Sequence, residues 1–184
     1  DGTKGLSVAH TNYTEALPEW TLSAWVRQTA AAGSEDGNTF LSSCYDDAAE
    51  ANTFYTRINP DRTFSLCHAG ASGSTADDDV TLTTSATAPL GAWTLLTAKA
   101  DGLNGISLYV NGVRQTVTAA VGGSSLTTNV YGAGKTWYLV PSGRATTGAP
   151  TALLIGKKLD AGTACFSGDM DDVTLYKRAL SDSE

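Results

Sequence analysis

Apolar and polar residues alternate with a period of two along much of the chain, the pattern of strands with one buried face. The clearest run is Trp20–Arg27, in which apolar Trp20, Leu22, Ala24 and Val26 alternate with Thr21, Ser23, Trp25 and Arg27. Similar short runs predict strands at 39–45, 53–59, 63–69, 80–84, 91–96, 106–110, 113–117, 153–156 and 170–176.

Turn sequences separate these runs. Two turn sequences, Asn59-Pro60-Asp61-Arg62 and Asn111-Gly112, each lie between two predicted strands and indicate hairpins. The second signal is the clearer one, because Asn-Gly tolerates the positive φ angles of a two-residue turn. The segments Thr29–Asn38, Ala69–Asp79 and Ala119–Thr151 have the composition of loops. Ser181–Glu184 matches a helix capping box and is the one helix signal in the sequence.

Length and composition indicate one all-β domain. The chain has 184 residues, which suits a single domain over 1–184. It is rich in Thr, Ala and Gly and contains a single Met, so strong helix formers other than Ala are scarce. Many short strands with frequent turns predict a two-sheet antiparallel sandwich.

Charge and hydropathy exclude two partner classes. The net charge is −7 and the basic residues are scattered, so no basic patch is expected for nucleic acid or anionic lipid. No apolar run is long enough for a transmembrane helix, and we expect no membrane insertion. The opening DGTKGLSV has neither an initiator Met nor a signal-peptide pattern. We therefore expect a domain excised from a larger secreted or surface protein.

Six sequence blocks, in order, resemble one family. They are DG…LSV at 1–8, WTLSAWV at 20–26, LGAW at 90–93, SLYVNG at 107–112, LIGK at 154–157 and FSGDMDDVTLYKRALS at 166–181. Together they resemble the laminin-G-like jelly roll of the concanavalin A-like lectin/glucanase superfamily. The resemblance implies a curved sandwich that serves as an extracellular module of an adhesin, receptor or glycosidase. Ala119–Thr151 is longer than the family's usual connection, and insertions at a sandwich rim often carry specificity.

Catalysis is not expected. Glucanases of this fold carry Glu-x-Asp-x-Glu on one strand, which places two carboxylates on one face around the glycosidic bond. The nearest segment here, Asp169-Met170-Asp171-Asp172, lacks both glutamates. Neither His10 nor His68 belongs to a recognisable catalytic or metal-binding motif.

Calcium is the expected metal, in a structural role. Hard cations bind clustered oxygens, which Asp46-Asp47, Asp77–Asp79 and Asp171-Asp172 could each supply. The resemblance implies that the Asp of the first strand and an Asp of the last block share the ion, so Asp1 and Asp171 are the predicted ligands. The acidic triplet is better explained as a solvated loop, although Asp78 is kept as a candidate for ligand binding.

The candidate sugar site is an aromatic cluster in the long insertion. Sugar recognition needs an aromatic platform with polar neighbours. We expect Trp20, Trp25 and Trp93 to fill the core, because they lie in strand blocks that match the family that the chain resembles. Trp137 and Tyr138 are then the remaining platform, with Tyr131, Lys135 and Arg144 nearby. The alternative is that these aromatic residues pack a small core within the insertion.

Two further expectations concern cysteines and location. If strands 39–45, 53–59 and 63–69 are consecutive neighbours, Cys44 and Cys67 are separated by a strand and lie about 9–10 Å apart, too far for a disulfide. This leaves the pairing of Cys165 open. Asn12-Tyr13-Thr14 is an N-glycosylation acceptor and agrees with an extracellular location.

The sequence thus favours a non-catalytic, lectin-like module that binds a glycan or glycoprotein on a surface or matrix, beside other domains of its parent chain. Two alternatives stay open. One is a structural or protein-adhesion module, and the other is an accessory domain of a glycosidase or sialidase.

Overall fold

A computed structural model of the chain describes residues 5–9, 17–30, 38–45, 52–68, 80–121, 124–137, 139, 150–157 and 165–184. The strands are β1 (Leu6–Ala9), β2 (Glu19–Gln28), β3 (Thr39–Tyr45), β4 (Asn52–Ile58), β5 (Thr63–His68), β6 (Val80–Thr87), β7 (Thr94–Asp101), β8 (Ile106–Val110), β9 (Val113–Arg114), β10 (Val117–Val121), β11 (Ser124–Thr128), β12 (Pro150–Ile155) and β13 (Gly168–Tyr176). A short 3₁₀ turn, η3 (Gly102–Asn104), joins β7 to β8. Among these residues no helix is long and apolar enough to cross a membrane.

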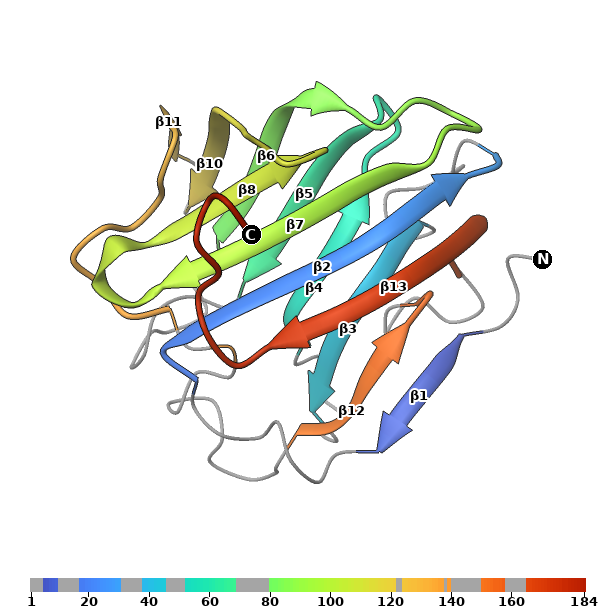
Figure 1. Cartoon of the computed structure of the whole chain (residues 1–184), viewed down its shortest axis with the longest axis horizontal. Coiled ribbons are helices and arrows are strands. Elements are labelled where there is room, and N and C mark those ends of the chain that lie inside the picture. Colours follow the sequence, from blue (N-terminus) through green and yellow to red (C-terminus); the bar gives the residue numbers. More distant parts are fainter. Residues whose placement is uncertain are drawn as a thin grey trace.

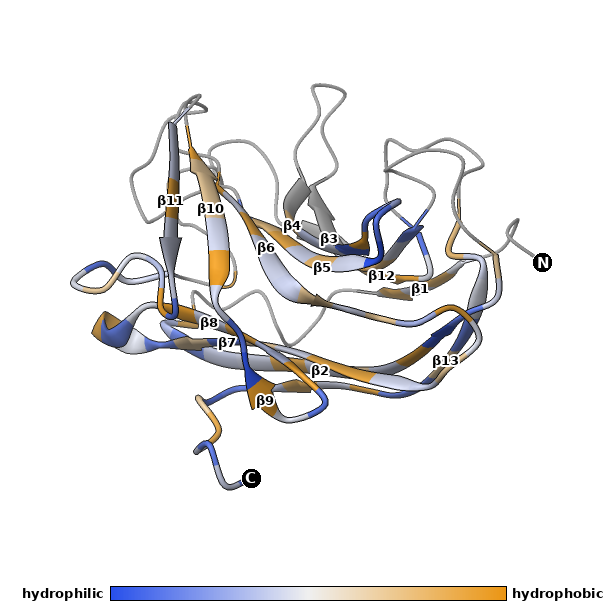
Figure 2. Ribbon diagram, turned by 90° about the horizontal axis from the view of Figure 1, so that it is seen from above, coloured by the Kyte–Doolittle hydropathy of each residue, from blue (hydrophilic) through white to orange (hydrophobic). Residues whose placement is uncertain are grey.

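The strands form two antiparallel sheets packed face to face (Figures 1 and 2). The large sheet has eight strands in the order β1-β12-β3-β4-β5-β6-β10-β11, and the small sheet has five in the order β13-β2-β7-β8-β9. This architecture confirms the predicted all-β sandwich of jelly-roll type. In Figure 2 the small sheet is the lower layer, and the C-terminal end of the chain lies beneath it.

Both predicted hairpins are present. Asn111 and Gly112 have φ angles of 51° and 74°, which allows the tight turn between β8 and β9. Asn111 also exchanges hydrogen bonds with the backbone of Leu95, which ties this turn to the start of β7. The β4–β5 hairpin closes through a hydrogen bond of 2.7 Å from the Arg62 amide to the Asn59 carbonyl.

The segment predicted to be one long loop, Ala119–Thr151, is partly sheet. β10 extends to Val121 and pairs along its length with β11, so the large sheet gains two strands at one edge. The polar residues of β11 do not alternate with apolar ones, since four of its five side chains are exposed at an edge. A strand with so few apolar residues has no alternating pattern, so periodicity could not predict β11.

The order of β3, β4 and β5 confirms the expectation for Cys44 and Cys67. β4 lies between the two cysteine-bearing strands, and Cys67 is a buried, free thiol. Cys165 is buried and free as well.

The core lies between the sheets, and Trp20 is at its centre with a fully buried ring. The Trp20 indole N–H donates to the Trp137 carbonyl at 2.8 Å, which joins the small sheet to the long insertion. The Trp137 ring is 2% exposed, and its own N–H donates to the Gly132 carbonyl at 3.0 Å. A Cβ at Gly132 would come within 2.3 Å of this ring, so Gly is required there.

The tryptophans therefore exchange their expected roles. Trp137, predicted as the exposed sugar platform, is part of the main core: its ring packs against His68, and its carbonyl accepts the Trp20 indole N–H. Trp25 and Trp93, predicted as core, are 37% and 42% exposed. Trp25 has the opposite parity to Trp20, Leu22 and Val26 on β2, so it must point away from the core.

This arrangement predicts different stabilities for two tryptophan variants. Trp137→Ala should lower the free energy of unfolding by about 3–5 kcal/mol, because it leaves a large cavity in the core. Trp25→Ala should cost about 0.5–1 kcal/mol, since its ring is partly in solvent. Urea denaturation followed by far-UV circular dichroism measures both. Equal losses for the two variants would contradict the assignment of Trp137 to the core.

Candidate functional site on the outer face of the small sheet

The exposed tryptophans lie together on the outer face of the small sheet. Trp25 on β2 is paired in register with Asp171 on β13 and with Leu95 on β7. One step along, Arg27 is paired with Asp169 and lies next to Trp93, whose ring centre is 5.2 Å from the Arg27 guanidinium carbon. Period-two alternation places these side chains on one face, so they form a single patch.

Arg27 orders the polar half of this patch. Its Nε and one terminal nitrogen donate to the same Asp169 carboxylate oxygen at 2.9 and 2.6 Å. Its cation stacks on the face of Trp93 at the same time, which restricts both side chains. The patch therefore presents two indoles, an ion pair and the carboxylate of Asp171, which also accepts a hydrogen bond from the Asp172 amide at 2.9 Å.

A pocket of about 150 Å³ adjoins the patch. Its lining includes Leu95, which is the cross-strand partner of Trp25. The pocket and the tryptophan patch are therefore neighbours on the sheet. Ser23 and Thr97 hydroxyls face each other at 3.2 Å on its floor. The remaining lining residues are Thr21, Lys99, Tyr109, Gly112, Tyr176, Leu180, Ser181, Asp182 and Glu184.

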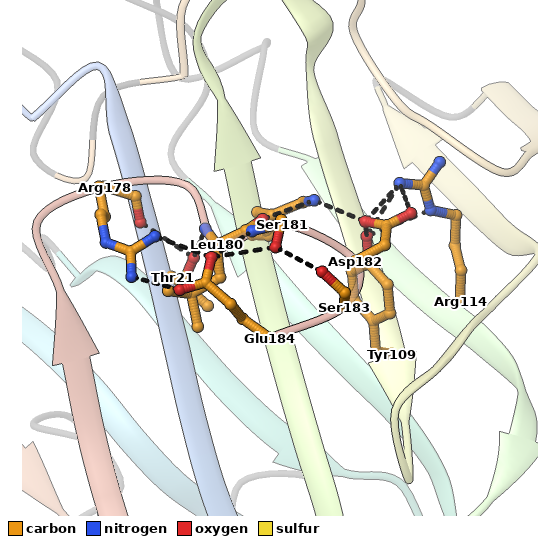
Figure 3. Close-up of polar contacts among 10 residues, drawn as sticks. Thr21, Tyr109, Arg114, Arg178, Leu180, Ser181, Asp182, Ser183 and Glu184 are labelled. Carbon is orange, nitrogen blue, oxygen red and sulfur yellow. Dashed lines mark hydrogen bonds and ion pairs between the residues drawn. The ribbon is translucent and has the colours of Figure 1, made fainter.

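The C-terminal tail, residues 177–184, covers this end of the sheet (Figure 3). The Thr21 hydroxyl donates to the Arg178 carbonyl and accepts from the Leu180 amide, each at 3.0 Å. The Glu184 carboxylate accepts from the Ser181 amide, which is one half of a capping box, and also from the Ser181 hydroxyl. It is also held by the Arg178 guanidinium. These bonds lower the pKa of Glu184 to about 2, with Arg178 the largest cause.

Asp182 fixes the tail to three strands. Its carboxylate accepts from Lys99 Nζ at 2.8 Å, from the Tyr109 hydroxyl at 2.7 Å and from the Arg114 guanidinium at 2.8 Å (Figure 3). The bonds from Lys99 and Tyr109 hold the pKa of Asp182 far below its ordinary value. Burial alone would lower the pKa of Lys99, but its hydrogen bonds to Asp182 and Tyr109 outweigh burial and raise that pKa.

This chemistry suits binding better than bond cleavage. A glycosidase needs one carboxylic acid whose pKa is raised so that it can donate a proton. The two carboxylates that line the pocket, Asp182 and Glu184, have lowered pKa values instead. Exposed indoles beside hydroxyl and charged groups can stack on the C–H face of a sugar and orient its hydroxyls.

The structure brings together few of the residues predicted for a site. Tyr131 is half-buried and packs on Trp137 with ring centres 5.3 Å apart, so both serve the core. Lys135 lies in an exposed turn. Tyr138, Arg144, Asp78 and Asp1 are outside the described residues. The carboxylate of Asp171 lies on the outer face beside Trp25.

The two predicted calcium ligands differ in where they lie. Asp171 is described but its expected partner, Asp1, is not. In the part of the chain that the structure covers, no three side chains of the His, Cys, Asp and Glu types are grouped so that they could hold a metal ion.

The network around Asp182 predicts a pH-dependent contribution to stability. Asp182→Asn should lower the free energy of unfolding at pH 7 by about 1 kcal/mol, a charge-assisted contribution reduced by solvent exposure. Because the folded pKa of Asp182 is depressed, the difference between wild type and variant should vanish as pH falls below about 3.9. Because the pKa of Lys99 is raised, the stability difference between wild type and variant should persist up to pH 10.5, the ordinary pKa of lysine. It should be lost as pH rises through the higher folded pKa.

Urea denaturation of both proteins between pH 2 and pH 11 measures this difference. Asp61→Asn is a matched control, because Asp61 also has a lowered pKa but caps the remote β4–β5 turn through Thr63. A difference that stays constant across the acid range would show that Asp182 does not act through its charge.

Comparison with solved structures shows the same fold. A carbohydrate-binding domain (CBM40) of the Ruminococcus gnavus IT-sialidase, bound to α2,3-sialyllactose, matches 100% of this chain and 96% of its own, with 13% identity and a TM-score of 0.58. The binding domain of Paraclostridial mosquitocidal protein 1 matches 97% of this chain and 39% of its own, with 12% identity and a TM-score of 0.57.

Larger enzymes contain the fold as one part. Trypanosoma rangeli sialidase matches over 90% of this chain with 18% identity and a TM-score of 0.55, and this chain spans 22% of that enzyme's length. No curated protein matches this chain in sequence. A family model does match, over residues 1–149. The chain belongs to the concanavalin A-like lectin/glucanases superfamily, in its laminin-G-like branch.

Proposed function

We propose that this domain is a non-catalytic carbohydrate-binding module that holds a glycan on the outer face of the small sheet. The observation that carries the proposal is the pair of exposed indoles, Trp25 and Trp93, beside the Arg27–Asp169 ion pair on the outer face of the small sheet. Large exposed aromatic residues cost hydration free energy and mark binding surfaces when they are adjacent.

The composition of the patch favours a sugar over an apolar ligand. Each indole offers a flat surface for a pyranose C–H face, while Arg27, Asp169 and Asp171 offer donors and acceptors around it. The adjoining pocket of about 150 Å³ is smaller than the roughly 300 Å³ typical of drug-sized ligands. It therefore suits one sugar ring at the end of a chain that stacks on the indoles.

Two comparisons support this proposal. The Ruminococcus gnavus domain of the same fold was captured with sialyllactose, and its length is nearly that of this chain. The domain also matches part of a much longer sialidase. A role as an accessory module of a larger extracellular protein, which places catalysis in a neighbouring domain, agrees with both.

One alternative has support in the structure. Leu90, 49% exposed, follows β6 in the turn that leads to Trp93. Indoles and a leucine on one side of a module could pack against the next domain of the parent chain. The glycan test below separates the two uses, because an interface for a neighbouring domain would bind no sugar.

The proposal predicts loss of binding on removal of the indoles. Wild type should bind its glycan with a dissociation constant of about 0.1–1 mM, as expected for stacking on an open surface. Trp25→Ala and Trp93→Ala should each weaken binding about tenfold, or about 1.4 kcal/mol, because each removes one stacking face. A glycan array identifies the ligand, and calorimetry with the best oligosaccharide gives the affinities.

Leu103→Ala is the matched control, since Leu103 is 64% exposed in η3, at the end of β7 opposite Trp93. Its affinity should equal that of wild type. If the Trp25 and Trp93 variants bind the array ligand as tightly as wild type does, the sugar lies elsewhere. Tyr138, Arg144 and Asp78, which remain predictions, would then be the next residues to replace. If wild type binds no glycan at millimolar concentration, the domain-interface alternative replaces this proposal.

We also retain structural calcium, held by Asp1 and Asp171, as a proposal. An ion that binds only the folded state raises stability by mass action. Addition of a chelator should therefore lower the melting temperature of wild type, and Asp171→Asn should remove this sensitivity. A melting temperature that is unchanged by chelator would contradict the proposal that the domain binds calcium.

A further inference from the structure

Four donor contacts converge on the carboxylate of Asp182. Lys99 Nζ and the Tyr109 hydroxyl reach Oδ1 at 2.8 and 2.7 Å, and the Arg114 guanidinium reaches both oxygens at 3.0 and 2.8 Å (Figure 3). The donors come from β7, β8 and β9, three adjacent strands of the small sheet. The sheet therefore provides a receptor for a carboxylate, and the tail provides the carboxylate.

The receptor is held together by contacts that do not involve Asp182. Arg114 donates two hydrogen bonds to the Tyr109 hydroxyl, at 3.2 and 3.0 Å, and stacks on the same ring. Lys99 stacks on the ring as well and donates to the Leu180 carbonyl at 3.0 Å. The Lys99 side chain is only 7% exposed. A buried ammonium needs an anionic partner, because desolvation penalises its charge.

Asp182 is one of several anchors of the tail and is the most exposed part of this network. Its side chain is 56% exposed, and it belongs to a segment with no regular structure. The tail is anchored independently, through the bonds of Thr21 to Arg178 and Leu180. A rotation of the Asp182 side chain into solvent would free the receptor while these anchors stay in place.

Charge favours an incoming anion at this point of an acidic protein. Lys99 and Arg114 supply two positive charges and Asp182 one negative charge, so the cluster is positive by one although the whole chain carries −7. The pocket next to the cluster is lined by Ser23 and Thr97 and reaches Leu95, which is the cross-strand partner of Trp25. A ligand with both a carboxylate and hydroxyl groups matches these surroundings.

We propose that Lys99, Tyr109 and Arg114 form a binding site for the carboxylate of an acidic sugar, and that Asp182 is an internal competitor that this sugar displaces. The inference rests on the proposed glycan-binding function and specifies its ligand class. A carboxylate tethered to the protein has an effective concentration in the millimolar range or above. A free carboxylate can bind only while Asp182 leaves the site empty, so its apparent affinity is reduced in proportion to the occupancy by Asp182. Removal of Asp182 should therefore improve the binding of acids alone.

The first experiment compares D-glucuronate with D-glucose by calorimetry. Asp182→Asn should bind D-glucuronate at least tenfold more tightly than wild type does, with the affinity for D-glucose unchanged. Asp61→Asn removes an equivalent carboxylate from the remote β4–β5 turn and should leave both affinities as in wild type. Arg114→Gln should abolish any preference for the acid. Equal affinities for acid and neutral sugar in Asp182→Asn would overturn the proposal.

The second experiment tests the receptor without a sugar. Sodium acetate at 100 mM should raise the melting temperature of Asp182→Ala by several degrees more than sodium chloride at equal ionic strength, while Asp61→Ala should respond equally to both salts. If acetate has no advantage in Asp182→Ala, the site does not bind carboxylates and the inference fails, whatever the glycan array shows. If acetate stabilises Asp182→Ala and no glycan binds wild type, the proposed function fails and the carboxylate receptor stands.

Discussion

The two-residue alternation of β2 is the constraint on which the rest of the structure depends. β2 lies inside the small sheet, paired with β13 on one side and β7 on the other, so its register fixes the face of every side chain nearby. Trp20, Leu22, Ala24 and Val26 fill the core, and Thr21, Ser23, Trp25 and Arg27 are committed to the outer face. A slip of one residue would exchange these sets, so the core and the candidate site are specified together.

The outer face is then divided by the C-terminal tail. At one end, the residues that follow β13 cover Thr21 and Lys99. The tail is hydrogen-bonded to both of these side chains through the backbone of Arg178 and Leu180. Trp25 and Arg27, at the other end, are left open. Because the tail is held by side chains of the sheet and not by strand pairing, its position depends on a few polar contacts. Such contacts are more easily exchanged for a ligand than a ladder of backbone hydrogen bonds would be.

Local features of the sequence predicted the fold, and long-range contacts decided the site. The hairpins at Asn59–Arg62 and Asn111-Gly112 follow from the turn residues themselves, and alternation located most strands. The partner of Trp20 could not be predicted in this way, because Trp137 is 117 residues away. The link between Lys99 and Asp182 spans 83 residues and has no periodic signal.

Two signals in the sequence disagree about Trp25. Alternation along β2 places it on the polar face of its strand, whereas the match of its block to the family implied a core position. The structure follows the alternation, because backbone geometry fixes the face on which each strand residue lies. Trp93 precedes its strand, so its position depends on the contact of its ring with Arg27, which no local pattern predicts.

A site on strands has different physical properties from the rim site that the insertion suggested. Strand positions inside a sheet are held by hydrogen bonds on both sides, so little conformational entropy is lost when a ligand binds. Trp25 has this support, while Trp93 gains it from Arg27 and the Arg27–Asp169 ion pair. The patch is bounded by β13 on one side and by the pocket under the tail on the other. A ligand of extended, repeating units fits such a strip, with its terminal ring in the pocket and its preceding rings on the indoles.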